Sequence, residues 1–140
     1  MNSPFVADAS VTIGWVHPTQ ATPETEEMLD ALIDGAVLEV PALWPLEVAN
    51  ALLVLERRRK LEPEERATAL DWLRMLPVRI DQEGASLAFS RLTELAERHQ
   101  LSTYDAAYLE LAMRRRRPLA CKDGALEKAA KRAGVRLWGK

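Results

Sequence analysis

Short apolar runs recur along the chain, and turn-forming residues bound most of them. The run from Ala36 to Val40, for example, is closed by Pro41. Continuous apolar runs of this length indicate strands that are buried on both faces, as in a parallel sheet. The predicted strands cover residues 4–7, 36–40, 77–80, 118–121 and 135–138.

Between these runs, apolar residues recur at the spacing of an α-helix. Met28, Leu29 and Leu32 form one such stripe, and Gly35 follows as a stop signal. Pro63 suits the first turn of another helix, and Ser102 or Thr103 is a good cap for a third. The predicted helices cover residues 10–16, 24–34, 43–60, 63–75, 83–99, 103–116 and 123–133.

Strands and helices alternate along most of the chain, which is typical of an α/β fold. We therefore expect a mostly parallel central sheet of about five strands, flanked by helices on both faces. The 140 residues fit one domain, residues 1–140, and we find no repeat or linker that would divide them.

Four acidic residues occupy equivalent places in this predicted topology. Asp8 follows the first strand, and Glu47 lies in the first turns of the helix after the second strand. Asp105 begins the helix that leads into the fourth strand, and Asp123 lies two residues beyond that strand. Because parallel strands end at one edge of a sheet, where ligands bind, we expect these four carboxylates to lie close together.

Four carboxylates gathered in this way repel one another strongly. At about 6 Å and an effective dielectric constant of about 20, each pair costs roughly 3 kcal/mol. Bound divalent cations relieve that repulsion, and ligands that are all carboxylate oxygens suit Mg²⁺ or Mn²⁺. Such ions next to a phosphodiester activate water and stabilise the leaving oxygen.

Each acid also has a purely structural interpretation. Asp8 and Asp123 are good helix caps, Asp105 suits the positive end of a helix, and Glu47 could be a surface residue. Polar neighbours support the functional interpretation: Ser10 can orient Asp8, and Asn50 lies one turn after Glu47. Lys122, beside Asp123, is our candidate for contact with a substrate.

Composition narrows the chemistry further. The chain has one cysteine and two histidines, too few for a disulfide framework or a cysteine-based zinc site. No segment approaches the roughly 18–20 unbroken apolar residues of a membrane span, and the N-terminus lacks signal-peptide features. We expect a cytoplasmic protein with no membrane contact.

The segments around the four acids resemble those of PIN-domain proteins, in particular the VapC-type toxin ribonucleases of type II toxin–antitoxin pairs. They occur in the family's order, with family-like spacing, and span almost the whole chain. The matching segments are residues 6–10, 45–52, 103–109 with Ala112, and 119–126.

This resemblance implies a PIN-like domain with Mg²⁺- or Mn²⁺-dependent endoribonuclease activity. It assigns Asp8, Glu47, Asp105 and Asp123 as the acidic metal-binding set. It also implies a homodimer, an RNA substrate, and a small antitoxin that binds the toxin and commonly also DNA. Where many relatives have Thr or Ser, this chain has Cys121, whose thiol is a weaker hydrogen-bonding group for supporting Asp123.

Two other functions remain open at this point. A catalytically weak or inactive PIN-fold interaction module fits Cys121 and the net charge of −2, but not the presence of all four acids. A phospho-acceptor signalling domain also has an acidic Mg²⁺ pocket. It needs paired acids after the first strand, which Asp8-Ala9 lacks, although Asp81 lies near the expected acceptor position.

The basic runs Arg57–Lys60 and Arg114–Arg117 end two predicted helices. Cations at helix C-termini complement the helix dipole, so we interpret both runs as structural or as partner surfaces rather than as RNA contacts. Trp15 and Trp44 are predicted near the carboxyl edge of the sheet, and we suggest them as lining for an antitoxin groove.

Overall fold

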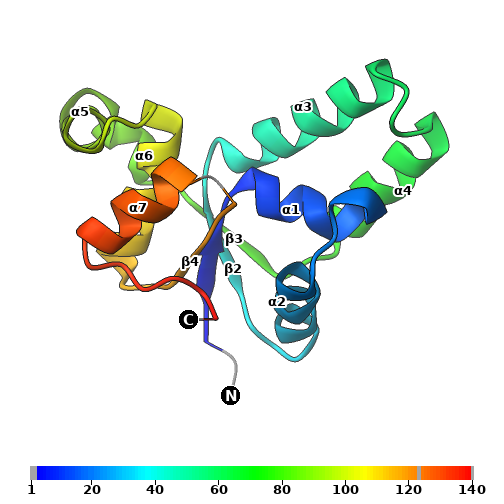
Figure 1. The fold of residues 1–140 in the computed structure, drawn as a ribbon, viewed down its shortest axis with the longest axis horizontal. Coiled ribbons are helices and arrows are strands. Elements are labelled where there is room, and N and C mark those ends of the chain that lie inside the picture. The colour runs from blue at the N-terminus through cyan, green and yellow to red at the C-terminus, as the bar shows by residue number, and fades with distance from the viewer. Residues whose placement is uncertain (1–2, 123, 140) are drawn as a thin grey trace.

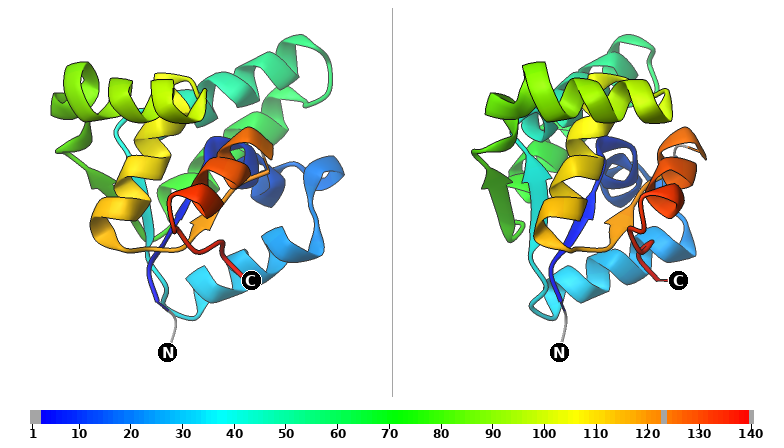
Figure 2. Two further views of the ribbon diagram at one scale, coloured as in Figure 1. Left: turned by 60° about the vertical axis from the view of Figure 1, so that its left-hand side comes forward. Right: turned by 90° about the vertical axis from the view of Figure 1, so that its left-hand side faces the viewer.

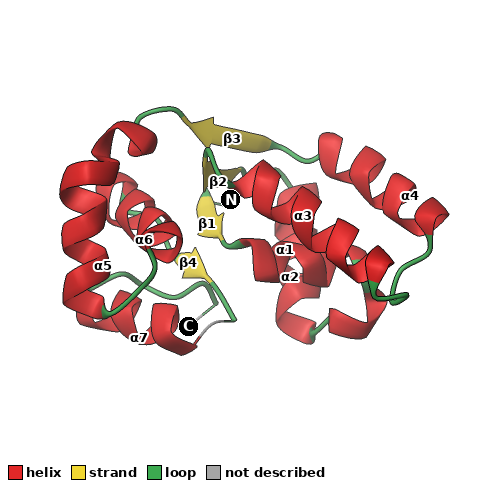
Figure 3. Ribbon diagram, turned by 90° about the horizontal axis from the view of Figure 1, so that it is seen from above, coloured by secondary structure: helices red, strands yellow, loops and turns green. Residues whose placement is uncertain are grey.

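The computed structural model describes residues 3–122 and 124–139. Four parallel strands form one sheet in the order β3-β2-β1-β4. Helices α1 to α4 lie on one side of this sheet and α5 to α7 on the other (Figures 1 and 3). The strands are β1 (Phe5–Ala7), β2 (Leu38–Pro41), β3 (Val78–Asp81) and β4 (Leu119–Ala120).

Local signals set most helix boundaries. The side chains of Asp8, Thr22 and Ser102 cap α1, α2 and α6, and a proline occupies the first turn of α2, α3 and α4. The helices are α1 (Ala9–Val16), α2 (Pro23–Ile33), α3 (Trp44–Arg57), α4 (Pro63–Arg74), α5 (Thr93–His99), α6 (Thr103–Arg115) and α7 (Gly124–Arg132). No helix in the described part of the chain is both long and apolar enough to cross a membrane.

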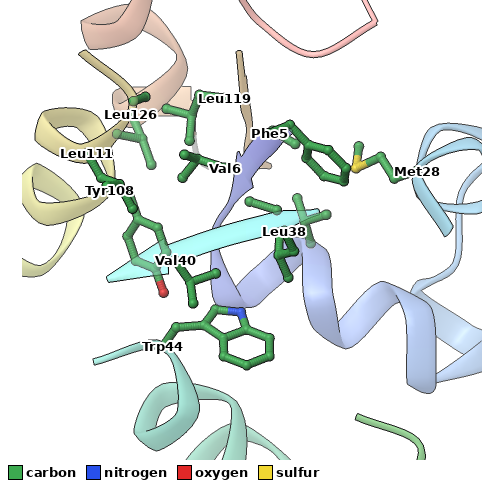
Figure 4. Packing of buried hydrophobic residues seen from close by; sticks show 14 of the residues in the cluster. Phe5, Val6, Met28, Leu38, Val40, Trp44, Tyr108, Leu111, Leu119 and Leu126 are labelled. Atoms are coloured by element: carbon green, nitrogen blue, oxygen red, sulfur yellow. The ribbon is translucent and has the colours of Figure 1, made fainter. Parts of the chain in front are cut away.

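The core lies on both faces of the central strands. All three residues of β1 are fully buried. Phe5 and Leu38 pack beside Met28 on one side of the sheet, while Leu111 and Leu126 approach from α6 and α7 (Figure 4). Helices α6 and α7 lie next to each other over that second face (Figure 2). Burial on both faces explains why β1 and β4 consist of apolar residues alone.

The structure confirms the predicted α/β class, with four strands in the described residues rather than five. The segment predicted as a strand at 135–138 forms only a single bridge, between Leu119 and Leu137. Leu119 donates its N–H to Arg136 O, and its carbonyl accepts from Trp138 N. The pairing stops there because β4 is two residues long and the chain turns at Gly139, where φ is +79°.

The predicted helix over 83–99 is divided into three pieces. Gly84–Leu87 is a 3₁₀-helix, Ala88–Leu92 is a π-helical turn, and only Thr93–His99 is α-helical. At the start of the first piece, Asp81 Oδ2 accepts the N–H of Gly84 at 2.7 Å. A Cβ at Gly84 would lie 2.8 Å from that oxygen, so this tight approach requires glycine.

Arginines at the end of α6 neutralise acids of the sheet. Arg114 contacts Asp81 at 2.7 Å, Glu110 at 2.9 Å and Glu83 at 2.9 Å. Arg114, Arg115 and Arg117 of this run thus form ion pairs with buried acids, which the interpretation of the run as helix-terminal charge did not anticipate. This network also gives Asp81 a structural role and removes the argument for a phospho-acceptor there.

Glu39, in the middle of β2, lies in the same network. Only 1% of its surface is exposed, yet it is an ionisable side chain on a central strand. Its carboxylate is contacted by Arg117 at 2.5 Å, Arg115 at 3.3 Å and Arg79 at 3.7 Å. Such pairing is what allows a charge to remain buried.

We predict that Asp81→Asn lowers the free energy of unfolding at pH 7 by about 1–3 kcal/mol, the range for a hydrogen bond to a charged group. Burial raises the pKa of Asp81, but the hydrogen bonds from Arg114 and Gly84 outweigh it and hold the pKa below its usual value. A lowered carboxylate pKa stabilises the fold above the unfolded-state pKa, about 3.9, and that contribution is lost as the pH falls below it.

Urea unfolding at pH 7 and pH 3 measures this effect, and the difference between the two proteins should shrink at pH 3. Asp71→Asn is the matched control, because Asp71 and Arg74 form an exposed ion pair within one helix. That change should cost less than about 1 kcal/mol. Equal effects of the two substitutions would contradict the structural role of Asp81.

Candidate active site

Asp8 lies at the point where β1 ends and α1 begins. Its N–H donates to Ala120 O at 3.1 Å, which extends the pairing of β1 with β4 by one residue. Its Oδ1 accepts from Val11 N at 3.1 Å and from Ser10 Oγ at 2.7 Å. Asp8 thus caps α1, and the hydroxyl of Ser10 donates a hydrogen bond to its carboxylate. With only 6% of its surface exposed, this carboxylate has a tightly defined position.

Glu47 lies on α3, one turn into the helix that follows β2. Its Oε1 accepts a hydrogen bond of 2.6 Å from the hydroxyl of Tyr108 on α6. Tyr108 is almost completely buried and reaches across the end of β2 toward the start of α3 (Figure 4). This hydrogen bond therefore joins helices from opposite sides of the sheet.

Asp105 lies in the first turn of α6, three residues before Tyr108. Its backbone N–H is capped by Ser102 Oγ at 3.0 Å, which fixes the start of the helix. Asp105 and Tyr108 share one face of α6, because residues three apart are neighbours on a helix. The carboxylate is partly buried.

The electrostatics of Tyr108 place the three acids in one neighbourhood. Burial raises the pKa of the Tyr108 phenol well above its ordinary value, and the hydrogen bond to Glu47 raises it further. The negative charges of Glu47, Asp8 and Asp105 add to this increase. Acids from three separate elements thus lie close enough to Tyr108 to act on the same hydroxyl.

A second hydrogen-bonded link holds α1 against α3. Trp44 Nε1 donates to Thr12 Oγ1 at 2.9 Å, and Thr12 Oγ1 in turn donates to the carbonyl of Asp8 at 3.1 Å. Thr12 is fully buried, and Trp44 nearly so. The link sets the start of α3, and with it Glu47, relative to Asp8.

Three further residues predicted to support the site or contact a substrate are Asn50, Lys122 and Cys121, and they differ in burial. Asn50 lies on the exposed face of α3. Lys122 is exposed, and its Nζ donates to Gln20 O at 2.8 Å, over the loop that follows α1. Cys121 is partly buried and lines a cavity of about 330 Å³ together with Trp138 and other residues.

Asp123 lies outside the described residues, so the structure gives the positions of three of the four predicted acids. Within residues 3–122 and 124–139, no group of three acidic, histidine or cysteine side chains is arranged to hold a metal ion. The donors gathered around Tyr108 are nevertheless carboxylate oxygens, the ligand type that Mg²⁺ and Mn²⁺ prefer.

Tyr108 and Thr12 are the site residues that sequence reasoning missed. Both carried a usable signal: Thr12 follows Asp8 by four residues and Tyr108 follows Asp105 by three, so each shares a helix face with an acid. Tyr108 is also the single hydroxyl-bearing residue in the run Ala106–Ala112.

An apolar groove of about 480 Å³ lies among α1, α2 and α4, at the side of the molecule. Trp15 and Trp72 line it, with Thr68 and Ala69 of α4, and Glu64 and Glu65 bring acidic side chains to its edge. Trp15 thus lies in a groove, as expected. Trp44 does not line this groove and borders a smaller hollow of about 180 Å³ between α3 and α4.

No protein-family model matches this sequence, and no curated protein matches it. Solved structures do match its fold. VapBC2 from Rickettsia felis, in a structure with a DNA fragment from its promoter, aligns with a TM-score of 0.65 at 12% identity, covering 96% of both chains. FitAcB from Neisseria gonorrhoeae aligns with a TM-score of 0.62 at 16% identity, also covering 96% of both.

PAE2754 from Pyrobaculum aerophilum matches with a TM-score of 0.62 at 17% identity, covering 92% of this chain and 87% of that one. The likeness to VapBC2 and FitAcB shows that this chain shares their fold, in agreement with the predicted α/β architecture. These matches cover between 92% and 96% of this chain.

Because the folded-state pKa of Tyr108 is raised, we predict an alkaline loss of stability that Tyr108→Phe removes. Above about pH 10 the phenol ionises in the unfolded chain, which lowers the free energy of the unfolded state. In the folded state the phenol stays protonated, so the folded state receives no such stabilisation. The unfolding free energy of the native protein should therefore fall more between pH 8 and pH 11 than that of the variant.

Urea unfolding across that pH range makes the comparison. Tyr104→Phe, the same change at an exposed position on the same helix, retains Tyr108 and should retain its alkaline loss. If the native protein and Tyr108→Phe lose stability in parallel, the inferred environment of Tyr108 is wrong.

Proposed function

We propose that this protein is a Mg²⁺- or Mn²⁺-dependent endoribonuclease that acts as the toxin of a toxin–antitoxin pair. The proposal is carried by the positions of three acids: Asp8 at the end of β1, Glu47 in the first turn of α3 and Asp105 in the first turn of α6. Tyr108 of α6 donates a hydrogen bond to Glu47 and thereby connects two of these elements. The fold shared with VapBC2 and FitAcB supports the same assignment. We further propose that it works in the cytoplasm, as a homodimer.

Asp8, Glu47, Asp105 and Asp123 would hold the ions in this proposal. When bound, a divalent ion lowers the pKa of a water molecule and stabilises the charge that develops on the leaving oxygen. The carboxylates supply the negative charge that attracts the cation, and their rigid supports keep the oxygens in place.

Residues of this chain hold two of the acids in position for the proposed hydrolysis. Ser10 and Val11 fix Asp8, and Tyr108 fixes Glu47, so two of the acids are held before any substrate arrives. We propose water as the nucleophile, which leaves 5′-phosphate and 3′-hydroxyl ends. Lys122 is our candidate for holding a flanking phosphate, in place of its present contact with Gln20.

We predict that the purified protein cuts total cellular RNA at discrete positions with Mn²⁺ or Mg²⁺ and not with EDTA. Asp105→Asn should reduce cleavage at least 100-fold, because it removes one carboxylate from the set that would hold the metal. Sequencing of the fragment ends identifies both the substrate RNA and the chemistry.

Two results would count against this mechanism. Fragments with 2′,3′-cyclic phosphate ends would show that the ribose hydroxyl, not water, attacks phosphorus. No cleavage with any metal, by protein shown to be folded and dimeric, would favour the catalytically inactive interaction module. Cys121→Thr, which restores a hydroxyl beside Asp123, would then be the variant to assay.

We also propose that the groove among α1, α2 and α4 receives an amphipathic helix of a small antitoxin. Trp15 and Trp72 offer apolar contact area, and the acidic edge formed by Glu64 and Glu65 complements a basic segment. VapBC2 was solved with a DNA fragment from its promoter, and we propose by analogy that the antitoxin of this protein binds DNA.

We predict that Thr68→Arg, which puts a long cationic side chain into this groove, weakens antitoxin binding at least tenfold and leaves RNA cleavage unchanged. Asp105→Asn protein serves as a bait in cells of the source organism, with Asp105→Asn/Thr68→Arg as the matched control. A small protein should be retained by the first bait and lost from the second. When added back in purified form, it should inhibit cleavage; equal retention by both baits would place its binding site elsewhere.

A further inference from the structure

Two groups of acidic side chains in this protein are stabilised in different ways. The acids of the sheet and of the end of α6 are paired with cations. Asp81 and Glu110 share Arg114, and Glu39 contacts Arg117, Arg115 and Arg79. Their charge is compensated within the fold.

Two acids of the candidate site, Asp8 and Glu47, accept hydrogen bonds from uncharged groups. Asp8 accepts from a serine hydroxyl and a backbone N–H, and Glu47 accepts from the phenol of Tyr108. Among the described residues, Glu47 forms no salt bridge. An uncharged donor orients a carboxylate and leaves its negative charge in place, whereas an arginine would both orient it and cancel that charge.

Tyr108 orients the carboxylate of Glu47 through one of its oxygens, Oε1. Its hydroxyl lies 2.6 Å from Glu47 Oε1, and only 1% of the residue is exposed, so packing fixes the direction of the bond. Because Tyr108 shares its helix face with Asp105, α6 determines both the place of Asp105 and the place of Glu47 on α3. The donor also remains a donor, because burial and the nearby negative charge keep its proton in place.

We propose that Tyr108 is a positioning residue for the metal site: its hydroxyl holds Glu47 in the orientation that binds a divalent cation, without neutralising it. The inference rests on the proposed function and assigns it a residue outside the four acids. Hydrogen-bonding partners of metal ligands typically account for about 10–100-fold in metal affinity.

Mn²⁺ binding by isothermal titration calorimetry tests the proposal without an RNA substrate. Tyr108→Phe removes one oxygen and keeps the ring, and circular dichroism checks that the variant is folded. Its Mn²⁺ affinity should fall about tenfold or more. Tyr104→Phe, the same chemical change at an exposed position four residues earlier, should leave the affinity unchanged.

Glu47→Ala separates positioning from a general effect on the fold. If Tyr108 acts through Glu47, then adding Tyr108→Phe to Glu47→Ala should cause no further loss of Mn²⁺ affinity. A loss of equal size in both backgrounds would overturn the proposal, and so would an unchanged affinity in Tyr108→Phe. Native protein that binds no Mn²⁺ would instead overturn the metal-dependent function itself, and this inference with it.

Discussion

Parallel pairing of β1 with its neighbours is the constraint on which the rest of the site depends. Val6 pairs with Leu119 on one side and with Glu39 on the other, so β1, β2 and β4 run in the same direction. The segments that follow these strands consequently start from one edge of the sheet. Asp8 follows β1 directly, and α3 carries Glu47 in its first turns after β2. Asp8 and Glu47 are far apart in the sequence, but they follow neighbouring parallel strands and so start from the same edge of the sheet.

Acidic residues around this sheet are supported in two ways: some are paired with arginines, and Glu47 of the candidate site is hydrogen-bonded to a neutral hydroxyl. A sheet buried on both faces leaves little room for water, so ionised groups within it need partners. Glu39 and Asp81 meet that need with arginines from the end of α6. In the middle of the same helix, Tyr108 supports Glu47 with a neutral hydroxyl. One helix therefore neutralises acids at its C-terminus and, two turns earlier, supports Glu47 without cancelling its charge.

The elements that could be predicted from the sequence are those governed by local signals. The buried strand β1 and the caps of α1 and α6 lie where the pattern places them, because burial and capping act over a few residues. The segment over 83–99 could not be predicted in the same way. Its apolar spacing is helical, but Asp81, which also contacts Arg114 33 residues away, accepts the N–H of Gly84 where the segment begins as a 3₁₀-helix. The end of the chain similarly forms one bridge where its apolar pattern predicts a strand, because β4 is too short to extend the pairing.

For the candidate site, the sequence alone predicted which acids belong to it and the edge of the sheet at which they lie. Alternating strands and helices are enough for that, because every parallel strand ends on the same side. Only the tertiary structure decided what holds the acids there. The Tyr108–Glu47 and Trp44–Thr12 hydrogen bonds join residues 61 and 32 positions apart, and no local pattern encodes such pairs. The roles of Arg114 and Arg117 were decided in the same way, because a run of arginines is compatible with solvent until the fold places buried carboxylates beside it.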